Sequence, residues 1–402
     1  MRSRIVQLML AGLIDSLCLS FAWTVLMLQI VADYGLGAAG LTSAAMLVGI
    51  ALSAPAASRL ARLLDGRRLL RFAASAEALM RMAVFALLAT SAPLLLIVVC
   101  VSLMNVTAWT GYAGMRAEVD AVSPGTSALT WYGTGVAAIE AVGAAAAALL
   151  PLVADMATPQ ALALVTVVYV LGLLPTVVVA GGSPIKRPEW RVAGLPGAGP
   201  RRLRDRFSPT VSMPVAAGVL LMFAASAPTL LSVGLAAELH GRSSVALVAV
   251  AFTVGSLAAP LVSRHVQRSS TNGPAVWLLC AVGMTVGWVL APWSVALMMA
   301  AQAVSGLCMT ALEGLLDTSI ATEAEAGVTG ALARGTAGRA LGSATAVALL
   351  PSAIDHVGLT PVMVVVTGLL GGGALLTRRR TSGTAGSMLA RSAVRGSADG
   401  RR

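Results

Sequence analysis

The chain alternates long apolar segments with short polar connections. Most of the apolar segments have about twenty residues, the length that a helix needs to cross the hydrocarbon core of a bilayer. None shows the alternation of apolar and polar positions that a membrane β-strand requires. The pattern predicts an all-α membrane protein with twelve transmembrane helices, near residues 5–31, 39–58, 70–90, 93–113, 128–153, 160–180, 213–236, 243–263, 274–292, 294–316, 328–351 and 359–377.

The twelve segments form two sets of six, because a short signature recurs after the second segment of each half. Ala-Pro-Ala-Ala-Ser-Arg at 54–59 is matched by Ala-Pro-Leu-Val-Ser-Arg at 259–264, about half a chain length later. A duplicated six-helix unit predicts two pseudo-symmetric bundles, an architecture that is typical of secondary transporters. We therefore expect bundles at 1–182 and 212–377, a basic Pro-rich linker at 183–211 and a disordered tail at 378–402.

The composition agrees with a chain that is mostly surrounded by lipid. Hydrophobic residues make up 57% and charged residues 11%, against about 25% charged residues in soluble domains, and the mean hydropathy is +0.85. The formal net charge is +11. Most basic residues fall on one side of the predicted membrane, and Arg242 is the only Lys or Arg in the connections of the other side.

This asymmetry follows the positive-inside rule and predicts that both termini and the linker are cytoplasmic. The basic charge then faces anionic lipid headgroups, so we expect no nucleic-acid partner. Lys186 is the single lysine among many arginines in an Ala-rich chain. This preference for arginine and alanine indicates a GC-rich bacterial genome. We therefore expect a multi-pass protein of a bacterial inner (plasma) membrane.

No sequence motif points to an enzyme or to a bound cofactor. The chain contains no phosphate-binding GxxxxGK[ST] loop, no HExxH and no CxxC, which are the signatures of nucleotide-driven and metal-dependent chemistry. The four cysteines lie singly in apolar segments, at Cys18, Cys100, Cys280 and Cys308. We therefore predict neither a metal site nor a disulfide framework.

Residues 58–68 read Ser-Arg-Leu-Ala-Arg-Leu-Leu-Asp-Gly-Arg-Arg. This stretch resembles the loop 2–3 motif of the major facilitator superfamily, Gly-x-Leu-Ala-Asp-x-x-Gly-Arg-Arg. It departs from that motif because Ser58 replaces the first Gly, Arg62 stands where the Asp belongs, and the closing Gly-Arg-Arg is shifted by one residue. Asp65 is the candidate substitute for the missing carboxylate. The resemblance implies a transporter that works by alternating access around a central cavity.

Ionised side chains inside a membrane are costly and need a reason. Asp15 and Glu140 lie deep in the first and fifth segments, which help to line the cavity in the resembling superfamily. We predict that they exchange protons and couple a proton gradient to transport, although either could instead be a neutral carboxyl that only packs. Glu77 and Arg81 lie four residues apart on one helix face, which predicts a structural ion pair.

Four further residues are candidates for the substrate cavity: Trp23, Asn105, Gln302 and Arg339. A buried amide needs hydrogen-bond partners, which favours Asn105 and Gln302. Trp23 could instead be an anchor near the membrane interface. Arg339 could bind an anionic group of the substrate or pair with a carboxylate.

Charged residues also gather at the predicted cytoplasmic ends of the helices. Opposite charges on adjacent helix ends could latch this side shut and part when it opens; the alternative is ordinary positive-inside charge with weak exposed pairs. The candidates for this gate are Arg59, Arg62, Asp65, Glu118, Asp120, Arg264, Arg268, Glu313, Asp317 and Arg334.

These features together predict a monomeric, proton-coupled secondary transporter that exports a small amphiphilic molecule. Its partners would be the substrate, protons and the lipid bilayer. Uptake of a small organic solute is an alternative within transport. A non-transporting membrane receptor or assembly factor would share the composition, but intramembrane carboxylates with a repeated loop signature favour transport.

Overall fold

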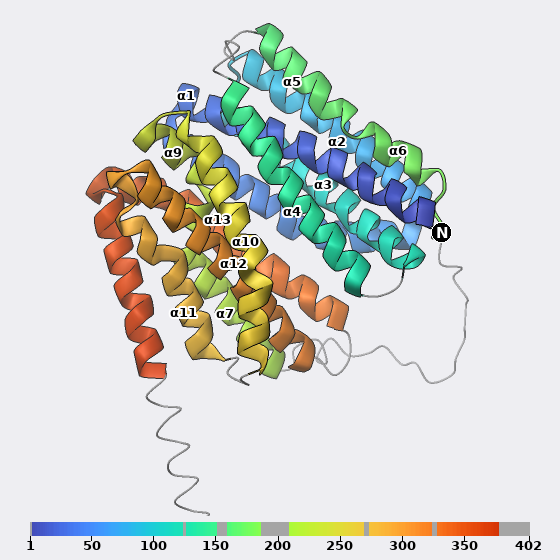
Figure 1. Ribbon diagram of the computed structural model, residues 1–402. Coiled ribbons are helices and arrows are strands. Elements are labelled where there is room, and N and C mark those ends of the chain that lie inside the picture. Colours follow the sequence, from blue (N-terminus) through green and yellow to red (C-terminus); the bar gives the residue numbers. More distant parts are fainter. Residues whose placement is uncertain are drawn as a thin grey trace, which may run out of the picture.

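A computed structural model describes residues 2–123, 126–150, 159–185, 209–268, 273–323 and 328–377, and these residues form helices and no strands (Figure 1). The first half contains α1 (Arg2–Leu63), α2 (Gly66–Ala89), α3 (Leu94–Val122), α4 (Thr126–Leu149), α5 (Pro159–Leu171) and α6 (Leu174–Ala180). The second half contains α7 (Pro209–Ala225), α8 (Ala227–Leu230), α9 (Ser232–His240), α10 (Ser244–Arg268), α11 (Pro274–Val286), η3 (Gly287–Val289), η4 (Ala291–Trp293), α12 (Val295–Glu323) and α13 (Val328–Val357). A last helical segment covers 359–377.

The described helices confirm the predicted fold class of an all-α bundle with twelve membrane-crossing segments. Nine helices of the described residues are long and apolar enough to cross a membrane, and two shorter apolar helices lie at Gly135–Leu149 and Met213–Ala225. The longest, α1, contains both of the first two predicted segments. The linker core (186–208) and the tail (378–402) lie outside the described residues, so the predicted domain boundaries stay predictions.

No loop separates the first two segments, contrary to the expected short connection. The helix is interrupted instead at Gly35, whose φ of 82° and ψ of 176° lie outside the helical region. Gly241 has φ 84° and ψ 162° at the equivalent turn between α9 and α10. Residues with a side chain rarely adopt positive φ, so glycine is required at the same point of each half.

Gly35→Ala should lower the stability of the protein by about 1 kcal/mol, because alanine is strained at this φ. The unfolding transition in detergent, followed by tryptophan fluorescence, would measure the loss. Gly37→Ala is the matched control, since neither position has a neighbouring atom that an added Cβ would meet and only Gly35 has a positive φ. Equal transitions for both variants would show that Gly35 carries no conformational requirement.

Close helix crossings repeat in the two halves as well. A Cβ at Gly49 of α1 would overlap the carbonyl oxygen of Ser102 in α3, and a Cβ at Gly255 of α10 would overlap that of Ala303 in α12. A second matched pair of contacts is Gly143 beside Leu17 and Gly342 beside Val219. Small residues allow membrane helices to approach closely, so each half is closed by equivalent glycine contacts, which supports the predicted duplication.

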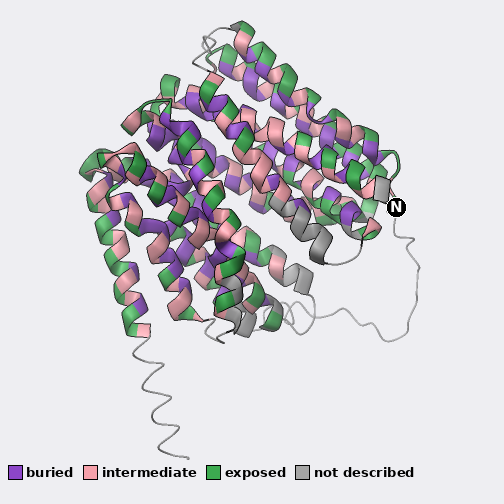
Figure 2. Ribbon diagram, in the orientation of Figure 1, coloured by how far each residue is buried: buried purple, intermediate pink, exposed green. Residues whose placement is uncertain are grey.

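Among the described residues, the two bundles share a hydrophobic core at one end only. At the end with Gly35 and Gly241, the core includes Leu36, Leu235 and Val347 from both halves. At the end that carries Arg4, which we call the basic end, the cores contain residues of one half each. In Figure 1 the bundle axes diverge away from the shared core, and Figure 2 shows buried positions gathered where α1, α9 and α13 meet.

Candidate functional site

The centre of the site is the ion pair on α2. Arg81 is 0% exposed and Glu77 is 3% exposed. Their four-residue spacing puts both on one face of the helix, and Nε of Arg81 donates to Oε1 of Glu77 at 3.0 Å. The structure therefore confirms the ion pair that the sequence predicts.

The pair is not confined to α2, however. Nη2 of Arg81 also donates to Oδ1 of Asp15 in α1 at 2.8 Å, and Nη1 donates to the backbone carbonyl of Tyr169 in α5 at 2.5 Å. The guanidinium lies over the Tyr169 ring, 3.9 Å from its centroid. A local pair is therefore too narrow a description, because Arg81 connects three helices of the first half.

The cluster of Asp15, Glu77 and Arg81 contains two carboxyl groups and one permanently charged guanidinium. If both carboxyl groups were ionised, one negative charge would be left in a setting where uncompensated charge is expensive. Binding of one proton makes the cluster neutral. Either carboxyl group of this cluster can therefore accept that proton.

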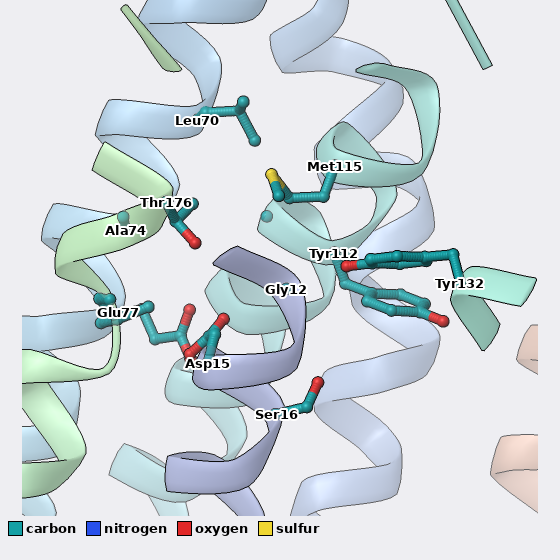
Figure 3. A pocket seen from close by; sticks show the side chains of 12 residues that line it. Gly12, Asp15, Ser16, Leu70, Ala74, Glu77, Tyr112, Met115, Tyr132 and Thr176 are labelled. Atoms are coloured by element: carbon teal, nitrogen blue, oxygen red, sulfur yellow. The ribbon is translucent and has the colours of Figure 1, made fainter. Parts of the chain in front are cut away.

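A small cavity of about 20 Å³ adjoins the cluster on the side of the basic end. Figure 3 shows the carboxyl groups of Asp15 and Glu77 directed toward it, with the hydroxyl of Thr176 in α6 pointing toward them. Tyr112 of α3 and Tyr132 of α4 close another side of the cavity. Five helices of the first half thus meet around it.

The structure places Glu140 apart from this cluster. It lies in α4, where the hydroxyl of Ser20 in α1 donates to its backbone carbonyl at 2.6 Å. Ser20 follows Asp15 by five residues on α1, so the two predicted proton-coupling residues lie on neighbouring helices. No ion pair or hydrogen bond joins their side chains among the described residues.

An aromatic group lies beside the cavity, and nothing in the sequence singles out its member Tyr132. The rings of Tyr112 and Tyr132 stack at 5.9 Å between centroids, and Trp109 packs edge-on against Tyr112 at 5.3 Å. The guanidinium of Arg116 lies 5.9 Å from the Tyr112 ring centroid. This group forms an amphipathic wall between α3 and α4.

The predicted cavity residues are placed differently from one another. Asn105 is 4% exposed and donates to the Val101 carbonyl of its own helix, and Gln302 is 2% exposed and donates to Ser232 of α9 at 2.9 Å. Trp23 packs against the core of the first half. Their contact with a substrate stays a prediction.

Arg339 of α13 pairs with a carboxylate, as one of its two sequence interpretations expects. Its Nη1 lies 2.8 Å from Oδ1 of Asp317 in α12. The side chain passes Gly218 of α7, where an added Cβ would lie 3.1 Å from its Cγ. The second half thus contains an arginine–carboxylate pair of its own, in which the side chain of Arg339 is 8% exposed and that of Asp317 is 42% exposed. Glu313 lies one turn before Asp317 on α12.

The candidate gate residues make no ion pair between the two bundles among the described side chains. Glu118 is completely buried, accepts a hydrogen bond from Ser183 and lies 3.8 Å from Arg4, all within the first half. Asp65 caps the start of α2 by accepting from the backbone N–H of Arg68 at 2.7 Å, while Arg59 and Arg334 are exposed. The side chains of Arg62, Asp120, Arg264 and Arg268 lie outside the described residues, and the latch stays a prediction.

Twelve membrane-crossing segments in two repeated bundles, joined at one end, define the fold of the major facilitator transporters. No protein-family model and no curated protein matches the sequence. Among solved structures, the nucleoside transporter NupG matches with a TM-score of 0.68 at 10% identity, over 93% of this chain and 98% of that one. A D-xylose-proton symporter matches with a TM-score of 0.70 at 12% identity, over 92% and 96%.

The inward-open conformation of the xylose transporter XylE from E. coli is also similar. Its TM-score is 0.67 at 12% identity, over 92% of this chain and 95% of that chain. At these identities the similarity concerns the fold, and the chemistry of the site has to be argued from the residues of this chain.

Proposed function

We propose that the chain is a secondary transporter in which a proton bound at the Asp15–Glu77–Arg81 cluster is coupled to the export of a small amphiphilic molecule. The observation that carries the proposal is the contact of Arg81 with Asp15 across two helices. An arginine that binds carboxyl groups from two helices makes their packing sensitive to protonation. The basic end is assigned to the cytoplasm on the positive-inside rule.

The exposure of the three side chains fits this role. The side chain of Asp15 is 26% exposed, whereas those of Glu77 and Arg81 are 3% and 0% exposed. Asp15 is therefore the member that protons and water reach first. When Asp15 is ionised, Arg81 holds α1 against α2; when Asp15 is protonated, the ion pair is replaced by a weaker hydrogen bond from the charged guanidinium to a neutral carboxyl group.

The difference in bonding between ionised and protonated Asp15 couples proton binding to transport. A transporter of this fold changes access by movement of one bundle relative to the other, and any group whose bonding differs between the two states biases that movement. Protonation of Asp15 weakens the contact between α1 and α2. Because α1 also contacts α13 of the other bundle, this weakening alters how α1 is held between the two bundles. Glu140 on α4 is the second proposed proton site, next to α1.

The substrate class is argued from the wall beside the cluster. Trp109, Tyr112 and Tyr132 offer ring faces with polar edges, and such groups bind molecules that have both an apolar body and a polar or cationic end. The nearby carboxyl groups of Asp15 and Glu140 suit a basic group better than an acidic one. An amphiphile therefore fits better than a sugar or a phosphate.

Uptake is the second candidate. One of the similar structures is named a proton symporter, and the same cluster could release its proton together with a substrate moving inward. The direction of proton movement in one experiment separates the two: exchange for an amphiphile indicates export, and parallel movement with a solute indicates uptake.

Asp15→Asn should reduce substrate-driven proton movement by about tenfold or more, because the residue that gains and loses the proton is removed. Purified protein in liposomes with a trapped pH dye, challenged with lipophilic amines, sugars and organic acids, measures this directly. Glu140→Gln tests the second site in the same assay.

Asp33→Asn is the matched control, since Asp33 is an exposed carboxylate of the same helix that bonds only to Gln29 in the described part of the chain. Full activity in Asp15→Asn would remove this cluster from the mechanism. Silence of the wild-type protein across the whole panel would favour the non-transporting receptor.

A further inference from the structure

Thr176 is a buried hydroxyl that the proposed mechanism does not yet use. It is 5% exposed, and its Oγ1 has no hydrogen-bond partner among the described protein groups. Most threonines inside these helices donate to a carbonyl of the preceding turn, as Thr110 and Thr166 do. A buried polar atom without a partner costs stability, so this exception needs an explanation.

The hydroxyl points into the cavity beside the charge cluster, toward the carboxyl groups of Asp15 and Glu77 (Figure 3). Arg81 bonds Oδ1 of Asp15 and Oε1 of Glu77. The second oxygen of each carboxyl group is therefore left for another partner. The cavity volume of about 20 Å³ exceeds the 10–15 Å³ or so that one water molecule needs.

We propose that Thr176 positions one water molecule that hydrogen-bonds to the free oxygens of Asp15 and Glu77, and that the cluster's proton passes between them through this water. This inference rests on the proton-coupled function proposed above. In the transfer, the protonated carboxyl gives its proton to the water oxygen while the water gives one of its own protons to the other carboxylate. The water is regenerated, and only the position of the charge has changed.

Water suits the cavity better than a metal cation. The guanidinium of Arg81 is in contact with both carboxyl groups, and its positive charge opposes a second cation beside it. A water molecule is neutral, and it can accept from the Thr176 hydroxyl and from the protonated carboxyl group while donating to the carboxylate. Three polar partners are also the usual number for a buried water.

The site is separated from bulk solvent at the basic end by an apolar layer. Leu8, Leu70, Met115 and Val179 pack together there, between the cavity and the buried Glu118. The water would therefore exchange slowly, and the proton would enter or leave through Asp15, the most exposed member. Thr176 is in this scheme a positioning residue, and Glu77 is the internal store of the proton.

Infrared difference spectra of the purified protein, recorded between two pH values in H₂¹⁶O and H₂¹⁸O, test the water directly. We expect an O–H stretching band that shifts with the oxygen isotope in the wild type and in Thr176→Ser, which keeps the hydroxyl. The band should be lost in the nearly isosteric Thr176→Val. A band that persists in Thr176→Val, or that the folded wild type lacks, would overturn the proposal.

Proton flux in liposomes gives the second readout. Thr176→Val should slow substrate-driven proton movement about fivefold, as expected for the loss of one hydrogen bond in the transfer, and Thr176→Ser should restore it. Substrate affinity should be the same in all three proteins. A variant whose structure is damaged would be expected to lose affinity as well as proton flux. Thr176→Ala serves as a second variant without a hydroxyl if the valine does not fold.

The two proposals fail in different ways. Wild-type protein that moves no protons with any substrate would overturn the proposed function and the transfer step, whatever the infrared result. If the wild type transports and Thr176→Val moves protons just as fast, only the role of the water is overturned.

Discussion

Arg81→Met should lower the free energy of unfolding by about 3–5 kcal/mol, since removal of one partner from a buried ion pair leaves an uncompensated charge. Arg81 is fully buried and bonds groups on α1, α2 and α5. Methionine fills much of the same volume, so the loss reports the missing bonds more than a cavity. Unfolding in detergent and the yield of monodisperse protein measure the effect.

Two further variants make this result specific. Arg71→Met changes an exposed arginine of the same helix and should stay close to the wild type. Adding Glu77→Gln to Arg81→Met removes one of the stranded carboxylates and should recover part of the loss, because the penalty belongs to the unpaired charge. A single Arg81→Met variant as stable as Arg71→Met would show that the cluster does not hold these helices together.

Gly255→Val should be the second most damaging change, at about 3 kcal/mol, the upper end of the usual cost of overpacking. The added side chain would have to occupy the space of the Ala303 backbone in α12. Backbone cannot turn aside as a flexible side chain can, so α10 and α12 must separate. The unfolding temperature and the protein's elution profile would record this.

Gly372→Val is the matched control for Gly255→Val. Gly372 lies in the last helical segment, and nothing lies within 4 Å of a Cβ placed there. Valine has a somewhat better helix propensity than glycine, so the control should be neutral or slightly stabilising. If both variants behaved alike, the close approach of α10 and α12 would not be needed for folding.

The sequence predicts the helices well because lipid imposes a simple requirement on length and polarity. Apolar runs near 70–90, 274–292 and 359–377 begin and end within a few residues of the observed helices. The turn at Gly35 was not predictable in the same way. A positive φ is a property of the backbone, and a single glycine among many apolar residues gives no sign of it.

The candidate site was predictable only in part, for a physical reason. The spacing of Glu77 and Arg81 fixes their contact, because both lie on one helix. The contact between Arg81 and Asp15 depends on how α1 and α2 pack, and no spacing in the chain encodes it. Thr176 and Tyr132 are common residue types in apolar helices, and only their place around a cavity makes them notable.

The glycine contacts of the two halves also bear on how the protein is made. The contacts of Gly49, Gly143, Gly255 and Gly342 each join helices of the same half, such as α1 with α3 and α10 with α12. Domains generally fold as units during synthesis, with the N-terminal one first. The first half can therefore complete its internal packing while the ribosome is still translating the second. Contacts between the halves, such as those of α1 with α9 and α13 and of α4 with α10, must wait until the second half has been made.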